Sequence, residues 1–333
     1  MPSQTRLHRP ARRQQKNTGK ALRTISAWIL AAAVGALCAA PAGAQDSGTL
    51  KKIMDKKVIT LGVREAAAPF SYFENKQYIG YSVDICMKIV EAVKTQLKMP
   101  ELTVATTKLT AENRIPMLLS GDIDLECGST TNSVERQKTV DFVVTTFFTG
   151  TRLLVKPSSL IRQYKDLKGR TVVVTTGTTN ERAIKEYNQQ ESLGMRFKQV
   201  KDHRDALAAI EKGTAAAFPM DDVLLYTMRT SALHPSEYAI VGEFLTDEPY
   251  AIMLRKNDPA FKKLANDTVT ALFKNGKINK IYARWFESPI PPGSINLYMP
   301  MNNTLKGLIR NPNADGVEAC GRMKCAAKPP SGL

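Results

Sequence analysis

An apolar run that ends in a hydroxyl-rich turn is the part of the chain best suited to hold a small anion. Residues 172–174 are three valines, which predict a buried parallel strand. The turn Thr-Thr-Gly-Thr-Thr follows at 175–179, and a helical pattern begins at Asn180. Unpaired backbone N–H groups at a helix start bind anions, and a glycine allows close approach. No lysine follows Gly177 as in nucleotide-binding loops, so the segment favours a small carboxylate over a nucleotide phosphate.

Polar side chains also follow the ends of several other predicted strands. Ligands of open α/β sheets bind at the carboxyl ends of the strands, so we expect these residues to converge. The set combines cations, hydroxyls and an acidic pair, which match the charges of an amino acid that carries a second carboxylate. Its members are Arg64, Ser129, Thr130, Thr131, the Lys201-Asp202-His203 run, Asp221 and Asp222.

Two further arginines are candidates, and each has an ordinary alternative. Arg136 follows the hydroxyl run and could clamp a carboxylate, or it could form a surface ion pair with Glu135 or Asp141. Arg114 lies in the first turn of a predicted helix, where the helix dipole disfavours a cation. Either a bound anion or Glu112 is therefore expected to compensate Arg114.

The remaining candidates also have two explanations each. Asp221 could accept hydrogen bonds from an ammonium group, or it could cap the helix that follows. His203 could donate to a carboxylate or be an ordinary loop histidine, and Arg64 could be a solvated charge at a strand end. Phe70 and Tyr72 could wall the aliphatic part of a ligand, with core packing as the alternative for Phe70.

The first 44 residues have the pattern of a secretory signal peptide. Residues 1–26 carry seven Lys or Arg and no acidic residue, residues 27–40 are apolar, and small residues precede a predicted cleavage after Ala44. A lipoprotein anchor at Cys38 and a twin-arginine signal at Arg12 and Arg13 match poorly. No second apolar stretch approaches 18 residues, so we expect a soluble exported protein.

Charge and residue counts exclude several function classes. Residues 45–333 contain 40 basic and 31 acidic residues, and these charges are interspersed rather than clustered as in a nucleic-acid interface. Only His203 and His234 remain after the leader, which excludes a multi-histidine metal site. Export permits a disulfide between Cys320 and Cys325. For Cys86 and Cys127, buried free thiols are favoured over a redox pair, and pairing of the two is the open alternative.

Strand and helix patterns alternate along the exported part, which predicts parallel sheets with crossover helices in two α/β lobes. A helix is expected over 111–119 with Thr110 as its N-cap. Crossovers between the lobes are expected at 149–151 and 243–247 and would form a hinge. The predicted organisation is a leader at 1–44, a discontinuous first lobe at 45–149 and 247–305, a second lobe at 150–246, and an irregular tail at 306–333.

Several motifs together resemble the family 3 extracellular solute-binding proteins, the periplasmic amino-acid receptors of ABC importers. The resemblance covers about residues 50–305, and the Glu-Cys-Gly-Ser-Thr-Thr block with the Lys-Asp-His run is similar to the glutamate/aspartate-binding branch. The motifs are Gly-Val-Arg-Glu at 62–65, Asn-Arg-Ile-Pro at 113–116, Glu-Cys-Gly-Ser-Thr-Thr at 126–131, Gly-Thr-Thr at 177–179, Lys-Asp-His at 201–203 and Met-Asp-Asp at 220–222.

The resemblance implies an α/β, two-lobed type II periplasmic-binding-protein fold with a two-crossover hinge. It implies that L-glutamate or L-aspartate binds between the lobes, with no catalytic residue, metal or cofactor. The implied roles are the α-carboxylate for Ser129, Thr131 and Arg136, the α-ammonium for Asp221 and the turn with Thr178, the side-chain carboxylate for Arg64, Arg114 and His203, and a further hydroxyl from Thr179.

One departure from the family pattern concerns Ala111, where relatives carry a serine. Losing that hydroxyl removes one contact of about 1 kcal/mol. The resemblance also implies a monomer that delivers its ligand to an inner-membrane permease with its ATPase. An exported enzyme of the cyclohexadienyl-dehydratase type is the alternative, with Glu65, Asp221 or His203 as the acid or base. A sensor module for a membrane kinase is a third hypothesis.

Overall fold

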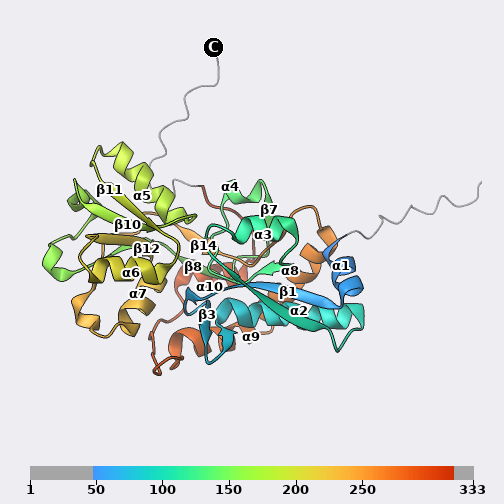
Figure 1. The fold of residues 1–333 in the computed structure, drawn as a ribbon. Coiled ribbons are helices and arrows are strands. Elements are labelled where there is room, and N and C mark those ends of the chain that lie inside the picture. The colour runs from blue at the N-terminus through green and yellow to red at the C-terminus, as the bar shows by residue number, and fades with distance from the viewer. Residues whose placement is uncertain (1–47, 319–333) are drawn as a thin grey trace, which may run out of the picture. The chain divides into compact units, whose positions relative to one another are not determined.

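The computed structural model describes residues 48–318. The predicted signal peptide and the expected Cys320–Cys325 disulfide lie outside the described residues. Two five-stranded sheets form the framework, as alternating strands and helices predicted (Figure 1). They are mixed rather than parallel as expected, because each also contains antiparallel strand pairs.

The first sheet carries the strand that ends in Arg64. Its order is β5 (Thr103–Leu109), β1 (Val58–Arg64), β6 (Leu125–Glu126), β15 (Met253–Arg255) and β7 (Val140–Phe142). Strand β1 pairs in parallel with β5 and β6, so the loops after these strands open at the same edge. Gly62 has no room for a side chain, because a Cβ there would lie 2.4 Å from a methyl carbon of Leu109.

The second sheet carries the hydroxyl-rich turn. Its order is β11 (Arg196–Val200), β10 (Thr171–Thr175), β12 (Ala217–Asp221), β9 (Thr151–Val155) and β13 (Ala239–Val241). Strand β10 is parallel to β11 and β12, while β9 runs antiparallel to β12 and β13. The valines of β10 are fully buried, as their β-branched run predicted.

A two-stranded ladder lies where the chain passes between the two sheets. Strand β8 (Phe147–Thr149) pairs antiparallel with β14 (Glu248–Tyr250). The chain enters β9 directly after β8 and returns from β13 to β14, so it passes between the sheets twice. The lobe limits expected from the sequence, 45–149 with 247–305 and 150–246, remain predictions. A small third sheet contains β2 (Ala66–Ala67), β3 (Ser71–Glu74) and β4 (Gln77–Ile79).

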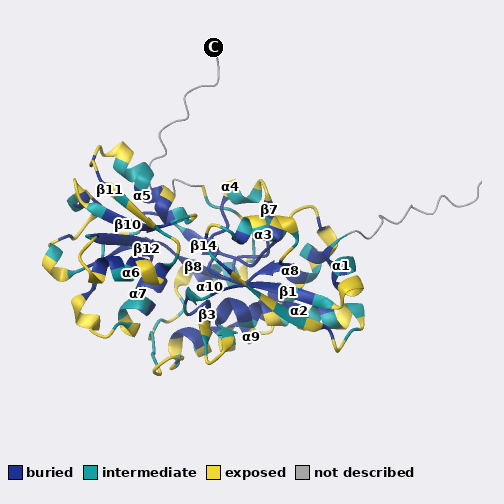
Figure 2. Ribbon diagram, in the orientation of Figure 1, coloured by how far each residue is buried: buried dark blue, intermediate teal, exposed yellow. Residues whose placement is uncertain are grey.

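Helices cover the sheets with their apolar sides inward, so the inner strands β1, β10 and β12 are almost continuously buried, whereas the edge strands β5 and β11 are partly exposed (Figure 2). Helices α2 and α8 contact each other, and α5, α6 and α7 contact the second sheet. The helices are α1 (Thr49–Lys56), α2 (Tyr81–Leu97), α3 (Arg114–Ser120), α4 (Val134–Gln137), α5 (Thr179–Gln190), α6 (His203–Glu211), α7 (Asp222–Ser231), α8 (Pro259–Lys274), α9 (Lys277–Tyr282) and α10 (Asn303–Arg310), with short 3₁₀ turns at Pro157–Ser159, Tyr164–Leu167 and Pro235–Glu237 and a π turn at Ala283–Glu287.

The helix expected over 111–119 begins later, so Thr110 is not its N-cap. Thr110 and Asn113 form a reciprocal turn: the Asn113 N–H donates to the Thr110 hydroxyl (3.1 Å), and the Thr110 N–H donates to the Asn113 amide oxygen (2.8 Å). Helix α3 then starts at Arg114. Pro116 is tolerated there because first-turn N–H groups have no intrahelical partner.

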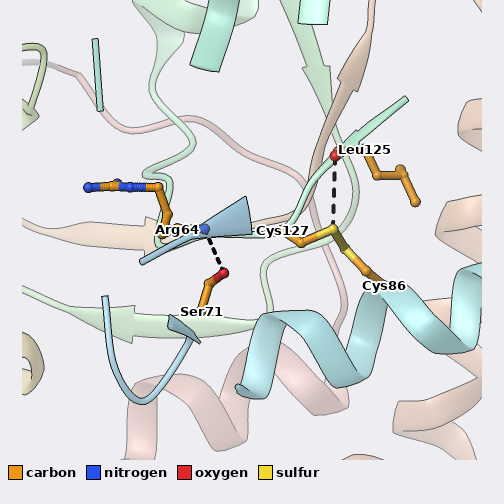
Figure 3. Close-up of a disulfide and its surroundings, with 5 residues drawn as sticks. All are labelled: Arg64, Ser71, Cys86, Leu125 and Cys127. Carbon is orange, nitrogen blue, oxygen red and sulfur yellow. Dashed lines mark hydrogen bonds between the residues drawn. A yellow bond between two sulfur atoms is a disulfide. The ribbon is translucent and has the colours of Figure 1, made fainter. Parts of the chain in front are cut away.

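The expectation of free thiols at Cys86 and Cys127 was wrong, since the two form a disulfide with their Cα atoms 6.2 Å apart. Figure 3 shows the bond joining α2 to the loop directly after β6. Both cysteines are fully buried. The separation of 41 residues gave no sign that the two elements meet, whereas helical spacing correctly placed Cys86 on the inner side of α2.

Candidate ligand-binding site

Among the described residues, none of the helices is both long and apolar enough to cross a membrane. The same residues contain no cluster of three or more His, Cys, Asp or Glu that could hold a metal ion.

A polar cavity is built from loops at the ends of strands in both sheets. Eight of the nine predicted site residues line it, namely Arg64, Arg114, Ser129, Thr131, Thr178, Thr179, His203 and Asp221. Asn180, Met220 and Leu224 also line the cavity and were not predicted.

Each lining residue is placed by the end of a strand or the start of a helix. Arg64 ends β1, and its backbone N–H donates to the Ser71 hydroxyl (2.9 Å), as Figure 3 shows. Thr178 caps α5 by accepting from the Glu181 N–H (3.1 Å). His203 begins α6, and Asp221 ends β12.

Arg136 is the ninth predicted residue, and it lies behind Thr131. Its Nη1 donates to the Thr131 carbonyl oxygen (2.8 Å), and its Nη2 donates to the Gly177 carbonyl oxygen (3.4 Å). The surface ion pair expected as an alternative does not form. Glu135 pairs with Lys138 and Asp141 pairs with Lys262.

Arg114 is buried and contacts both sheets' loops. Its Nη1 donates to the Thr130 hydroxyl (2.6 Å), and its Nη2 donates to the Gly177 carbonyl oxygen (3.4 Å). Its Nε is buried without a hydrogen-bond partner among the described residues. Burial lowers the pKa of Arg114, and the charge that opposes this shift most strongly is that of Glu126. The compensating acid is therefore Glu126 rather than Glu112.

Glu126 is fully buried, and neither of its carboxylate oxygens has a hydrogen-bond partner among the described residues. Burial lowers the pKa values of Arg64, Arg114 and Arg136, and the charge of Glu126 opposes this shift in all three. Burial and the proximity of Arg114 act against it and lower the pKa of Arg64 to about 10 and that of Arg136 to about 9. The guanidinium groups therefore stay charged at neutral pH, and a bound anion would relieve their repulsion.

His203 is buried against Arg64. Its Nδ1 lies 2.9 Å from the Thr175 hydroxyl, and its Nε2 lies 3.5 Å from Nη2 of Arg64. Burial, followed by the charges of Arg64 and Arg114, lowers the pKa of His203 well below 6.5. The imidazole is therefore neutral at pH 7.

Asp221 is held in place by two donors and does not cap α7. The Asn180 amide donates to its Oδ1 (2.7 Å), and the Tyr250 hydroxyl donates to its Oδ2. Burial, followed by the charge of Glu248, raises the pKa of Asp221 to about 8. A cation beside Asp221 would favour the carboxylate and lower this pKa, so its binding below pH 8 would release a proton.

The aromatic residues suggested as ligand walls do not line the cavity. Phe70 is buried in a cluster with Tyr81, Phe147 and Tyr250, so the core-packing alternative is right. The Tyr72 hydroxyl donates to the Pro291 carbonyl oxygen (2.7 Å).

Sequence reasoning missed the acids behind the cavity. Glu248 accepts hydrogen bonds from Thr131 and Thr179, and Glu126 faces the arginines. An acid at the edge of a predicted strand was the available signal in both cases, since Glu126 closes the strand 123–126 and Glu248 precedes Pro249-Tyr250-Ala251.

Comparison with known proteins shows the family of the chain. The profile of bacterial extracellular solute-binding proteins, family 3, matches residues 59–288. The chain belongs to this family. This solute-binding protein is 45% identical over 300 residues to the L-glutamate/L-aspartate-binding protein of Pseudomonas aeruginosa, covering 89% of this chain and 99% of the relative. It is 44% identical over 295 residues to the glutamate/aspartate import solute-binding protein of Salmonella typhimurium, covering 88% and 98% of the two chains.

Solved structures confirm the two-lobed type II periplasmic-binding-protein fold of this solute-binding protein. An ancestral arginine-binding protein bound to arginine superimposes with a TM-score of 0.63 at 27% identity, covering 69% of this chain and 98% of that one. An ancestral amino-acid-binding protein described as a precursor of cyclohexadienyl dehydratase superimposes with a TM-score of 0.62 at 25% identity, covering 72% and 99%. The fold therefore carries more than one ligand, and the lining residues must decide which.

Proposed function

We propose that this chain is the periplasmic receptor of an ABC importer, that it binds L-glutamate and L-aspartate in the cavity, and that it delivers them to a membrane permease. The observation that carries the proposal is the pairing of buried Arg64 and Arg114 with buried Asp221 around one cavity. An acidic amino acid has two carboxylates and one ammonium group, so it matches both kinds of charge at once.

The side-chain carboxylate is assigned to Arg64 and Arg114, with His203 beside them. Both arginines are nearly inaccessible to solvent, so an uncharged ligand would leave their charge poorly compensated. Glutamine and asparagine would lose about 2–5 kcal/mol of binding free energy for that reason. The α-carboxylate is assigned to Arg136 and Ser129, and the ammonium group to Asp221 with the turn at Thr178.

Ligand binding is coupled to lobe closure in this proposal. Several hydrogen bonds that line the cavity join the loops of one sheet to those of the other, including Arg114 to Gly177 and Thr131 to Thr179. A ligand held by residues from both sides stabilises the closed arrangement relative to the open one.

Ala111 marks the place where the family pattern carries a serine. It is buried, and its carbonyl oxygen lies 2.9 Å from where a Cβ on Gly177 would stand. Without that hydroxyl the ligand loses one hydrogen bond, which corresponds to about 1 kcal/mol of binding free energy.

The exported form is proposed to begin after Ala44, to act as a monomer, and to meet the permease and its ATPase in the periplasm. The enzyme alternative is disfavoured by relatives named as solute-binding proteins at 44–45% identity. Glu65, one of its suggested catalytic groups, is engaged by Lys108 and Arg204 and does not line the cavity.

Calorimetric titration of residues 45–333 tests the function, after unfolding and refolding to remove carried-over ligand. We expect one-to-one binding of glutamate and aspartate, with glutamine and asparagine much weaker. Absence of binding by every acidic amino acid would overturn the proposal, and turnover of prephenate or arogenate would support the enzyme alternative instead.

A further inference from the structure

A buried carboxylate, Glu248, lies where hydroxyl groups from the two sheets meet. It begins β14, one of the two strands of the connecting ladder, and it is 1% exposed. Its Oε2 accepts from the Thr131 hydroxyl and from the Thr179 hydroxyl (2.8 Å). Thr131 and Thr179 line the cavity, whereas Glu248 lies behind them.

The Glu248 carboxylate determines whether the hydroxyl groups of Thr131 and Thr179 act as hydrogen-bond donors or acceptors toward a ligand. A hydroxyl group has one hydrogen to donate, and an ionised carboxylate can only accept. Both hydroxyl hydrogens therefore point at Glu248, and the two oxygen atoms, which lie 3.3 Å apart, keep only lone pairs for the cavity. Acceptors at these positions suit an ammonium group and repel a carboxylate.

The second carboxylate oxygen of Glu248 fixes the direction of a longer chain of hydrogen bonds. Thr246 donates to Oε1 (2.6 Å), so Thr151 must donate to Thr246 (2.7 Å). The Asn180 amide then donates to Thr151 (2.7 Å) and to Oδ1 of Asp221 (2.7 Å). Glu248 and Asp221 are thus the two ends of one network, and both direct acceptors or negative charge toward the ligand.

We propose that Glu248 is a positioning residue that turns Thr131 and Thr179 into acceptors for the α-ammonium group, and so makes the site select amino acids over dicarboxylates that lack one. This inference rests on the proposed function. It also changes the role of the Thr131 side chain, which the family resemblance assigned to the α-carboxylate.

The variant Glu248→Gln tests the proposal, because an amide in place of Oε2 would donate to the threonines and release their hydrogens toward the cavity. The readout is the ratio of the dissociation constants for glutarate and L-glutamate, which have the same two carboxylates and differ in the ammonium group. We expect L-glutamate binding to weaken at least tenfold and glutarate binding to stay level or tighten, so that the ratio falls at least tenfold. Glu243→Gln, which removes an exposed charge from the same connection, is the matched control and should leave the ratio unchanged.

Each other outcome has a defined meaning. Equal weakening for both ligands, or an unchanged ratio in a folded variant, would overturn the positioning role while leaving the receptor function intact. Failure of the wild-type protein to bind L-glutamate would instead overturn the proposed function. If Glu248→Gln does not fold, Thr179→Val decides the question: a fall in the ratio supports the proposal, and an unchanged ratio overturns it.

Discussion

The Nε2 atom of His203 lies 3.5 Å from a guanidinium nitrogen of Arg64, and its Nδ1 atom lies 2.9 Å from the Thr175 hydroxyl. A guanidinium can only donate, so Nε2 accepts and the ring proton is on Nδ1. The imidazole thereby accepts a hydrogen bond from Arg64 without adding a further cation beside Arg64 and Arg114.

We therefore expect His203 to stay neutral across the range in which an isolated histidine titrates. Burial and the charges of Arg64 and Arg114 hold its pKa well below 6.5. Residues 45–333 contain only one other histidine, the exposed His234, so both rings can be followed by NMR of the imidazole nitrogens between pH 5 and 8. A charged His203 ring at pH 6 in the ligand-free protein would contradict this assignment.

Replacing Arg114 by methionine should separate acidic ligands from their amides. The variant removes a buried charge that we assign to the side-chain carboxylate, so glutamate should lose about 2–5 kcal/mol of binding free energy and glutamine much less. The contact of Arg114 with the Gly177 carbonyl is lost for both ligands and cancels in the comparison. Calorimetry with both amino acids is the measurement, and Arg182→Met, at an exposed site on α5, is the control. Equal losses would remove Arg114 from the side-chain subsite.

Glutamate affinity should depend on pH through Asp221. Its pKa is about 8 in the ligand-free protein, because burial and Glu248 disfavour the carboxylate. A bound ammonium group favours the carboxylate and lowers that pKa, so binding below pH 8 releases a proton. Affinity should then rise from pH 6 to pH 8, by up to tenfold per unit, and level off above that range. Calorimetric titrations in buffers of different ionisation enthalpy measure the number of protons released on binding. The variant Asp221→Asn should abolish this release. If that variant released the same number of protons, a group other than Asp221 would be responsible.

The Cys86–Cys127 disulfide should contribute to the stability of the first sheet. Closing a loop with a sequence separation of 41 residues lowers the entropy of the unfolded chain, which corresponds to about 4 kcal/mol. Urea unfolding of the ligand-free double variant Cys86→Ala/Cys127→Ala should show a loss of this size, and reductant should destabilise the wild-type protein but not the variant. Equal unfolding free energies for the two proteins would contradict the prediction.

Local sequence patterns correctly predicted much of what positions the site. Arg64 and the loop at 129–131 lie together because the parallel strands β1 and β6 end at the same edge of the first sheet. Asp221 ends a strand of the second sheet and lines the same cavity. The hydroxyl-rich turn caps α5 through Thr178, as a strand–turn–helix pattern predicts.

Long-range contacts could not be predicted in the same way. Glu248 reaches Thr131 and Thr179 across 117 and 69 residues, from an antiparallel strand whose pairing depends on the whole fold. The two cysteines meet for a similar reason. The late start of α3 has a local cause, since the reciprocal turn between Thr110 and Asn113 competes with the helix for the same backbone groups.

The carbonyl group of Gly177 accepts from Arg114 and from Arg136, each at 3.4 Å, and its backbone has no space for a side chain against Glu112. One carbonyl group in the loop after β10 therefore contacts two guanidinium groups, and we assign these two groups to different carboxylates of the ligand. A ligand with two carboxylates would contact both arginines, whereas a ligand with a single carboxylate would contact one of them. Binding of both carboxylates would thus stabilise the closed arrangement more than binding of either one alone.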